Sequence, residues 1–300
     1  MMNVLAFDLG GTNIKYGVVS QDGNILTQGK VQTPNQLDDL LFIIKDQLRN
    51  YSLYNIEGIA ISCPGSVAES GFIYGSSAIP YIHGPNMKKL IEDSTGLAVS
   101  IENDANCAAL AEVWKGSAVG KSDIAVVVIG TGVGGALIKN GSIHKGNNLH
   151  GGEFGYMILN ANNLGNGMST FSDVASTSSI IRRVALQKKI SQNLLTGEII
   201  FSDAEKGDEI CQEAIADFYY MLAIGLYNIQ YVFDPELILI GGGISQRQDL
   251  VSEIQDRLMQ ITDKIDVATL SPTIDSCYFS ADANIIGAVH NYMKKTDQIN

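Results

Sequence analysis

An acidic step in the segment Ile101–Glu112 (IENDANCAALAE) carries the residues best suited to chemistry. In it, Glu102-Asn103-Asp104 joins an apolar run to a small-residue helix expected over residues 105–115. A carboxylate at such a strand end can take the proton of a bound hydroxyl group as that hydroxyl attacks a phosphoryl group. Asp104 is therefore the candidate general base. The alternative for Asp104, and the commoner role for an isolated Asn-Asp step, is the N-cap of the following helix, which Asn103 could equally supply.

Three glycine clusters follow apolar runs and could bind phosphate groups. Glycine lets backbone amides approach a phosphate without an intervening Cβ, and consecutive amides can form an anion-binding concavity. In the first two clusters a neighbouring threonine, Thr12 or Thr131, would add a hydroxyl donor. The alternative for either of these two is a hairpin turn that binds nothing. The clusters are Gly10-Gly11, the segment Gly130–Gly135 and Gly241–Gly243.

The sequence GTGVGG at 130–135 superficially matches the dinucleotide-binding fingerprint, which requires a helix to begin immediately after it. Here an apolar run at 136–138 and an Asn-Gly turn follow, and this pattern predicts a second strand and a hairpin. The pattern of 123–142 also repeats that of 4–24, about 120 residues earlier, which indicates a duplicated half-fold. A phosphate clamped by two similar lobes therefore fits better than a dinucleotide fold.

Other polar groups lie where strands are expected to end. Asp8 follows the first strand and could hold Mg²⁺ through water, because Mg²⁺ binds few carboxylates and retains much of its hydration. The alternative for Asp8 is an ordinary turn aspartate. Gly65 and Glu153 lie in comparable positions, so these groups and the acidic step predict a site for a polyhydroxylated ligand at the strand ends. His150 could hydrogen-bond such a ligand, although a lone loop histidine is more often only solvated.

The elements that must position these groups alternate between strands and helices, which is typical of an α/β fold. Apolar alternation predicts an antiparallel opening of three strands. Helical periodicity predicts helices over Leu37–Asn50 and Asp173–Leu186, and a strand is expected around Cys277–Phe279.

Two lobes are expected from the change in composition along the chain. Small and polar residues at 116–122 mark the boundary. We expect a smaller N-terminal lobe of residues 1–116 joined by a C-terminal helix at 283–300, and a larger lobe of residues 117–282. The last helix would pack back on the first lobe.

Composition restricts the class of protein. The 300 residues are 45% hydrophobic and 17% charged, which describes a soluble protein with a substantial core. The formal charge of −12 argues against a nucleic acid partner. No apolar run is long enough to cross a bilayer and the N-terminus lacks a basic leader, so we expect a cytoplasmic protein without membrane partners. The four cysteines are scattered, which favours reduced and mostly buried thiols.

Six segments, taken in order, resemble those of the bacterial ROK sugar kinases. Each is a weak signal by itself, but the ordered set is highly specific and covers essentially the whole chain. The resemblance implies an actin-like ATPase (ribonuclease H-like) fold, two lobes with a central cleft for ATP and sugar, and a homodimer. The segments are Asp8–Asn13 (DLGGTN), Ile61–Gly65 (ISCPG), Glu102–Asn106 (ENDAN), Ile129–Gly135 (IGTGVGG), Gly152–Gly155 (GEFG) and Ile240–Gly243 (IGGG).

The resemblance also implies what individual residues do. Asp104 would be the catalytic base, and Asp8 would hold Mg²⁺ through water. The residues that would bind sugar are Gly65, Asn103, Asp104, His150 and Glu153. The residues that would bind ATP, the last three of them beside the adenosine, are Asp8, Gly10, Gly11, Thr12, Asn13, Lys15, Gly130, Thr131, Gly132, Gly134, Gly241, Gly242 and Gly243.

The chain departs from the family where many relatives bind a structural zinc ion. Those relatives have a histidine directly after the Glu-x-Gly segment and a cysteine cluster soon afterwards. This chain has Tyr156 in place of the histidine, and Asn163, Gly165 and Thr170 where the cysteines would fall, so no zinc is expected. A glutamate that contacts sugar in many relatives corresponds approximately to Ser172.

Three further segments look most like those of the zinc-free beta-glucoside kinases. These enzymes phosphorylate a glucose unit of a disaccharide such as cellobiose at its 6-hydroxyl. The loss of side chains around the anomeric oxygen would leave room for an aglycone. A glucokinase or an N-acetylmannosamine kinase is the alternative. The segments are His150–Met157 (HGGEFGYM), Thr196–Phe201 (TGEIIF) and Tyr231–Gly243.

Two alternatives belong to another class of protein. ROK relatives include sugar-responsive transcriptional repressors, which carry a helix-turn-helix domain ahead of the first glycine turn. Only seven residues precede Asp8 here and the chain is acidic, so a DNA-binding role is not expected. The other alternative is a sugar-sensing regulatory protein without catalysis.

Overall fold

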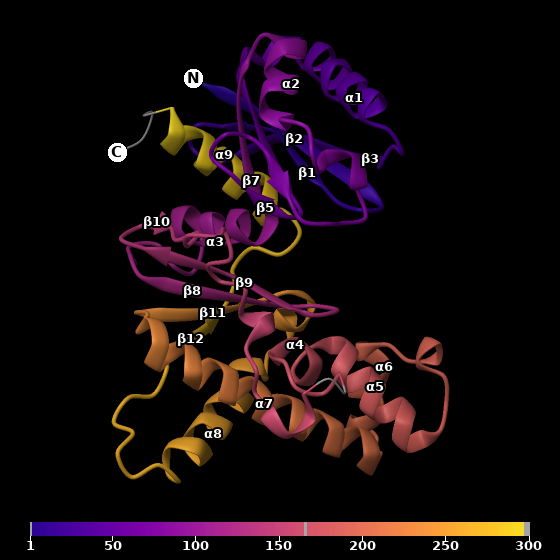
Figure 1. The fold of residues 1–300 in the computed structure, drawn as a ribbon, viewed down its shortest axis with the longest axis vertical. Coiled ribbons are helices and arrows are strands. Elements are labelled where there is room, and N and C mark those ends of the chain that lie inside the picture. Colours follow the sequence, from indigo (N-terminus) through magenta and orange to yellow (C-terminus); the bar gives the residue numbers. More distant parts are fainter. Residues whose placement is uncertain (1, 165–166, 297–300) are drawn as a thin grey trace. The chain divides into compact units, whose positions relative to one another are not determined.

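The computed structural model describes residues 2–164 and 167–296, which form two compact units (Figure 1). The segment 145–151 packs with the first unit, although the chain on both sides of it belongs to the second. Gly165 and residues 297–300 of the predicted C-terminal helix lie outside the described residues. Of the described residues, unit 1 comprises 2–120, 145–151 and 278–296, and unit 2 comprises 121–144, 152–164 and 167–277.

Unit 1 is built on a five-stranded mixed sheet in the order β3-β2-β1-β4-β7. The first three strands form the predicted antiparallel opening, β4 pairs parallel to β1, and β7 pairs parallel to β4. Because parallel strands run the same way, β1, β4 and β7 bring their carboxyl ends to one edge of the sheet. The strands are β1 (Asn3–Leu9), β2 (Asn13–Ser20), β3 (Ile25–Gln32), β4 (Ile56–Cys63) and β7 (Ala98–Asn103).

Helices cover both faces of this sheet. Successive residues of β1 point to opposite faces, so Leu5 and Phe7 pack with α1 and α2, whereas Val4 and Ala6 pack with α3 and α9. The C-terminal helix α9, yellow in Figure 1, packs against α3, β4 and β7 as predicted. The predicted helix Leu37–Asn50 is also confirmed. The helices are α1 (Leu37–Asn50), α2 (Met87–Thr95), α3 (Asp104–Lys115) and α9 (Ala283–Lys295).

Short elements fill the connections of unit 1. Residues between β4 and α2 form a two-stranded hairpin and a 3₁₀ turn. Gly96 ends α2 with a φ of 74°, a left-handed conformation that glycine adopts without strain. These elements are η1 (Ser52–Tyr54), β5 (Ser66–Val67), β6 (Ile73–Tyr74) and η2 (Pro80–Ile82).

Unit 2 repeats the sheet of unit 1. Its strands follow the order β10-β9-β8-β11-β12, with an antiparallel β8–β9–β10 opening and parallel β8–β11 and β11–β12 pairs. The two sheets therefore share one topology, which confirms the predicted duplication. Asn140 and Gly141 form the predicted hairpin turn with φ values of 52° and 70°. The strands are β8 (Ile124–Ile129), β9 (Val133–Lys139), β10 (Ser142–Ile143), β11 (Leu237–Gly241) and β12 (Ile274–Ser276).

The helices of unit 2 pack one apolar cluster against its sheet, with Val127 and Ile240 from the strands and Phe218 and Leu222 from α7. No helix within 2–164 and 167–296 is long and apolar enough to span a membrane. The helices are α4 (Phe171–Val174), α5 (Thr177–Lys188), α6 (Gly197–Glu205), α7 (Glu209–Phe233) and α8 (Leu250–Thr262), and the 3₁₀ turns are η3 (Phe154–Tyr156), η4 (Ala161–Asn163), η5 (Gln192–Leu194) and η6 (Gly243–Gln246).

Two predicted elements are corrected. The single helix predicted over Asp173–Leu186 is two helices, because Ser176 accepts from the Ser179 N–H and caps α5. The strand predicted around Cys277–Phe279 is β12, which ends at Ser276. The Tyr278 and Phe279 N–H groups instead donate to the buried carboxylate of Glu112, at 3.0 and 2.8 Å.

The cysteines follow the expectation of buried thiols. Cys63, Cys107 and Cys211 are buried, and Cys277 is half-buried. Burial raises the pKa of the Cys63 and Cys107 thiols well above the ordinary value, so both remain protonated. They act as small apolar core residues.

Candidate active site

The carboxyl ends of three parallel strands bring together Asp8, predicted to hold Mg²⁺, and the acidic step that leads to the candidate base Asp104. In the register of the sheet, Asp8 of β1 pairs with Ser62 of β4, and Ser62 pairs with Glu102 of β7. Asn103 is the last residue of β7, and Asp104 is the first residue of α3. The sheet therefore places Asp8 and the acidic step at the same edge.

Asn103, rather than Asp104, is the N-cap of α3. Its Oδ1 accepts a hydrogen bond from the backbone N–H of Asn106 at 3.2 Å. Its Nδ2 donates to the Gly65 carbonyl at 3.1 Å and to Asp104 Oδ1 at 2.9 Å. Cap and candidate base are thus separate residues, and the Gly65 carbonyl is bound by the cap residue, Asn103.

The Asp104 carboxylate has one engaged oxygen. Oδ1 accepts hydrogen bonds from Asn103 Nδ2 and, at 2.9 Å, from the Ala105 N–H, whereas no other described residue hydrogen-bonds Oδ2. Burial raises the pKa of Asp104 and the charge of Asp8 adds to this effect, while the Ala105 N–H opposes it. A half-buried carboxylate with a raised pKa and an available oxygen can accept a proton from a bound hydroxyl group.

As in Asp104, only one carboxylate oxygen of Asp8 accepts hydrogen bonds from other described residues. Its Oδ1 accepts from Ser62 Oγ at 2.9 Å and from Asn284 Nδ2 at 3.0 Å, and no other described residue hydrogen-bonds Oδ2. A single carboxylate with an available oxygen fits Mg²⁺, which usually takes one or two protein carboxylates, substrate phosphates and several waters. The partners Ser62 and Asn284 were not found from the sequence, because neither carries a motif and Asn284 lies 276 positions away.

The first glycine turn is closed tightly. The Gly10 N–H donates to the Asn13 carbonyl at 3.1 Å, and the Thr33 N–H donates to the Thr12 carbonyl at 3.0 Å. A Cβ on Gly11 would lie 2.7 Å from Ala78 Cβ, so a side chain is excluded there. The side chains of Thr12 and Asn13 are exposed and available to a ligand.

Lys15 follows this turn on β2. Its Nζ donates to the Ala281 carbonyl at 2.9 Å, just before α9. The ammonium group is therefore fixed at a defined position in unit 1, with two further N–H bonds available for an anion.

The second and third glycine clusters meet in unit 2. The turn between β8 and β9 is closed by a hydrogen bond from the Gly130 N–H to the Gly132 carbonyl at 2.9 Å. A Cβ on Gly242, whose φ is 91°, would lie 2.1 Å from the Ile129 carbonyl oxygen. The end of β11 thus lies directly against the end of β8. Strand β9 begins at Val133, so no helix follows the turn and the dinucleotide fold is excluded.

Ser172 braces this turn. Its Oγ accepts from the Val133 N–H at 2.9 Å and donates to the Val133 carbonyl at 3.2 Å. The Thr177 N–H donates to the Gly130 carbonyl at 2.9 Å. Thr131 and Gly132 at the tip of the turn are exposed. The base of the turn is therefore held by hydrogen bonds, while its tip is accessible to a ligand.

Glu153 lies in unit 2, directly before the short turn η3. The residues on either side of it, Gly152 and Phe154, fix its position. A Cβ on Gly152 would lie 2.7 Å from Ala136 Cα, and Phe154 is buried beneath Gly135. Glu153 itself is exposed, and the Tyr156 side chain is 74% exposed. The fold therefore presents a carboxylate and an aromatic ring on one short segment.

His150 lies at the end of the segment 145–151, in unit 1. Its Nδ1 is 2.7 Å from the Asn148 carbonyl, and its side chain is exposed. The predicted sugar-binding residues are thus divided: Gly65, Asn103, Asp104 and His150 belong to unit 1, and Glu153 belongs to unit 2.

A cavity of about 520 Å³ opens beside the third glycine cluster in unit 2, within the usual size range of small-molecule sites. Gly243 and Ile244 form one side and α5 and α6 form the other. The Arg247 guanidinium lies 4.1 Å from the centre of the Phe201 ring. Of this lining, the sequence singled out Gly243 as a ligand residue and marked Thr196–Phe201 only as a point of resemblance.

One of the positions where many relatives bind zinc has another role here. Thr170 caps α4, because its Oγ accepts from the Asp173 N–H at 3.2 Å. Gly165 lies outside the described residues. In the part of the chain that the structure describes, no group of three or more His, Cys, Asp or Glu residues could hold a metal ion.

Two sheets of identical topology, each with a glycine turn after its first strand, define an actin-like ATPase fold. The ROK family model matches residues 4–291, and the chain belongs to this family. It is an ATP-dependent carbohydrate kinase, and kinases of this family use ATP with Mg²⁺.

Individual relatives match over nearly the full chain. The beta-glucoside kinase of Klebsiella pneumoniae is 35% identical over 295 residues, which cover 97% of this chain and 96% of the relative. The beta-glucoside kinase of Listeria monocytogenes is 33% identical over 300 residues, 99% of each chain. A crystal structure of a ROK family protein from Streptococcus pneumoniae in complex with sucrose superposes with a TM-score of 0.92 at 38% identity, covering 99% of this chain and 100% of that one.

Proposed function

We propose that this kinase transfers the γ-phosphoryl group of ATP to the 6-hydroxyl of a glucose unit, and that its acceptor is a beta-glucoside such as cellobiose. The observation that carries the acceptor assignment is Tyr156, whose exposed side chain stands where many relatives have a zinc-binding histidine. Two curated relatives named beta-glucoside kinase support it, as does a relative crystallised with sucrose, a disaccharide.

The chemistry of the segment that follows Glu153 suits a second sugar ring. A tyrosine ring offers an apolar face and a polar hydroxyl, the combination that matches the C–H and O–H groups of a sugar. Ser172 and Thr170 are short and engaged in hydrogen bonds within unit 2. Ser172 is smaller than the glutamate that contacts sugar at about this position in many relatives, which would leave room for an aglycone.

The proposed reaction is a direct transfer. The sugar 6-oxygen attacks the γ-phosphorus, the bond from that phosphorus to the β–γ bridging oxygen breaks, and ADP leaves. Asp104 Oδ2 orients the hydroxyl and receives its proton. Because the transition state is loose, positioning and charge stabilisation dominate. The other sugar contacts are assigned to Gly65, Asn103, His150 and Glu153.

The glycine turns are assigned to ATP. In unit 1 the phosphate contacts are Gly10, Gly11, Thr12, Asn13 and Lys15. Bound Mg²⁺ neutralises phosphate charge, and Asp8 would hold its water shell. No structural zinc is required, because the corresponding positions lack its ligands. In unit 2 the phosphate contacts are Gly130, Thr131, Gly132 and Gly134, and the cavity beside Gly241, Gly242 and Gly243 takes the adenosine.

The assembly and location are also proposals. The family resemblance supports a homodimer, which light scattering on the purified protein measures. The use of ATP as donor supports a cytoplasmic enzyme.

The acceptor is tested by initial rates of ADP release with cellobiose, glucose, fructose and N-acetylmannosamine. We expect the highest kcat/KM with cellobiose, and Asp104→Asn serves as the inactive control. A higher kcat/KM with glucose would instead identify a glucokinase. Sugar binding without ADP release from any acceptor would contradict catalysis and leave a sensor.

A further inference from the structure

A buried carboxylate lies two residues before the candidate base Asp104. Glu102 on β7 is 1% exposed. Its Oε1 accepts from the Asn103 N–H at 3.0 Å and from Asn106 Nδ2 at 3.0 Å. Glu102 thus holds the backbone at the end of β7 and the first turn of α3 from inside unit 1. A buried charge of this kind requires a partner of opposite charge.

That partner is Lys145. Its Nζ lies 2.8 Å from Glu102 Oε2 and donates to the Val67 carbonyl at 2.9 Å. The Lys145 side chain is 15% exposed, so the pair is shielded from water and salt. The opposite charge of Glu102 and the additional hydrogen bond to Val67 identify a specific anchor rather than a surface contact.

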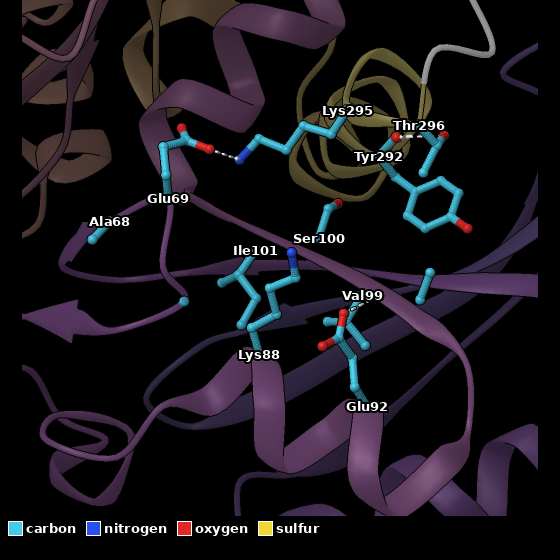
Figure 2. A pocket seen from close by; sticks show the side chains of 12 residues that line it. Ala68, Glu69, Lys88, Glu92, Val99, Ser100, Ile101, Tyr292, Lys295 and Thr296 are labelled. Atoms are coloured by element: carbon cyan, nitrogen blue, oxygen red, sulfur yellow. Dashed lines mark hydrogen bonds and ion pairs between the residues drawn. The ribbon is translucent and has the colours of Figure 1, made fainter.

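A second, more exposed ion pair, Glu69 with Lys295, lies next to this anchor. Glu69 lies 3.5 Å from Lys145 and 3.2 Å from Lys295 of α9, and Figure 2 shows the Lys295–Glu69 pair beside Ser100 at the edge of a cavity of about 110 Å³. The Glu69 side chain is 72% exposed, and Lys295 is 4.0 Å from Glu102. The inner Lys145–Glu102 contact is therefore the short and buried one.

Lys145 opens the segment 145–151, whose flanking chain belongs to unit 2. The Gly151 N–H donates to the Lys145 carbonyl at 2.8 Å and closes this segment into a loop. His150 lies within the loop, and Glu153 follows two residues after its end. Lys145 is thus the point at which the loop is fastened to β7, the strand that leads to Asp104.

We propose that Lys145, acting through Glu102, is a positioning residue for phosphoryl transfer. The loop bears His150 and leads to Glu153. Lys145 fixes this loop to the carboxyl end of β7, where Asn103 ends the strand and Asp104 begins α3. This inference rests on the proposed function for the roles of those residues. Lys145 touches neither substrate nor reacting atoms in this role, and it sets the geometry in which they meet.

The test uses Lys145→Met, Glu102→Gln and the double variant in the full chain. Loss of positioning should lower kcat/KM for the sugar about 10–100-fold in Lys145→Met, with the KM for ATP within about twofold of wild type. Thermal stability should fall in each single variant, which leaves one charge buried, and recover in the neutral double variant. The double variant should nevertheless keep the low kcat/KM. Lys139→Met, at an exposed lysine on β9, is the matched control.

Hydrogen–deuterium exchange supplies a readout that does not depend on activity. Lys145→Met should speed exchange in peptides covering 145–151 and 103–106, and leave α1 unchanged. A double variant with wild-type kcat/KM, or unchanged exchange in 145–151, would overturn the proposal. If the wild-type protein phosphorylates no sugar, the proposed function fails, while the exchange result still reports on the anchor.

Discussion

Asn284, on the C-terminal helix α9, donates a hydrogen bond to Asp8 Oδ1 at the end of the first strand, at 3.0 Å. Ser62 Oγ donates to the same oxygen at 2.9 Å. The carboxylate proposed to hold the Mg²⁺ water shell is thus oriented by two donors, and one of them comes from the opposite end of the chain.

Asn284→Ala should raise the Mg²⁺ concentration required for half-maximal activity. Partners that orient metal-binding groups typically contribute 10–100-fold, and we expect a change of about tenfold here. Asn284→Asp should be worse, because it places a second carboxylate against Asp8. Titration calorimetry with Mg·ATP checks the effect without turnover. An unchanged Mg²⁺ dependence in both variants would show that Asp8 does not hold the Mg²⁺ or that Asn284 does not orient Asp8 for this role.

Asp104→Asn should lower kcat by at least about 10²-fold while ATP binding persists, because a positioned base typically contributes that much. The wild-type kcat/KM should fall as the pH decreases, since the base acts only when deprotonated. Burial raises the pKa of Asp104, so this acidic limb should lie above the ordinary value of 3.8. A pH–rate profile measures the limb. Near-wild-type turnover in the variant would refute the assignment.

Tyr156→Ala should reduce kcat/KM for cellobiose about tenfold, the order expected for loss of one aromatic stacking contact, and change kcat/KM for glucose little. The comparison of the two acceptors in one variant separates a contact with the second ring from general damage. Equal losses for both acceptors would show that Tyr156 does not face the aglycone.

Gly242→Ala should destabilise the protein by about 1–3 kcal/mol, because a Cβ there would lie 2.1 Å from the Ile129 carbonyl oxygen at a φ of 91°. Gly243→Ala is the matched control, since no atom lies within 4 Å of its Cβ position. Urea unfolding of the two variants checks the difference. Similar midpoints would mean that β11 can move away from β8.

His290 should make the fold sensitive to acid. It is buried on α9, stacks on Trp114 at 5.0 Å, and neither ring nitrogen has a partner among the described residues. Burial, with a contribution from Lys294, lowers its pKa from 6.5 to about 4. The unfolded chain therefore binds a proton that the folded chain does not, and stability is lost as the pH falls from about 6.5 towards 4.

The slope of that loss is at most about 1.4 kcal/mol per pH unit. Urea unfolding followed by Trp114, the single tryptophan of the chain, measures it at pH 7.5 and 5.5. His290→Phe keeps a stacked ring without a titrating group and should flatten the dependence. The same dependence in both proteins would assign it to other groups.

Much of the fold was predictable because local signals agreed with the tertiary structure. The apolar face of 37–50 predicted α1, and the Asn-Gly pair predicted the hairpin turn at Asn140 and Gly141. The signals failed where side chains compete for backbone groups. Ser176 interrupts an apolar periodicity that continues across it, and Glu112 takes the N–H groups of Tyr278 and Phe279, which ended β12 early.

The sequence by itself determined the two glycine turns and the acidic step, because each depends on residues within a few positions of one another. It also determined the repeat, because the same short pattern occurs twice along the chain. Only the tertiary structure decided which residues support them. Asn284 meets Asp8, and Lys145 meets Glu102, across long stretches of chain and without a motif. Such pairs form because a buried or half-buried carboxylate needs donors from the element that packs beside it, and the packing of α9 and of the loop 145–151 selects them.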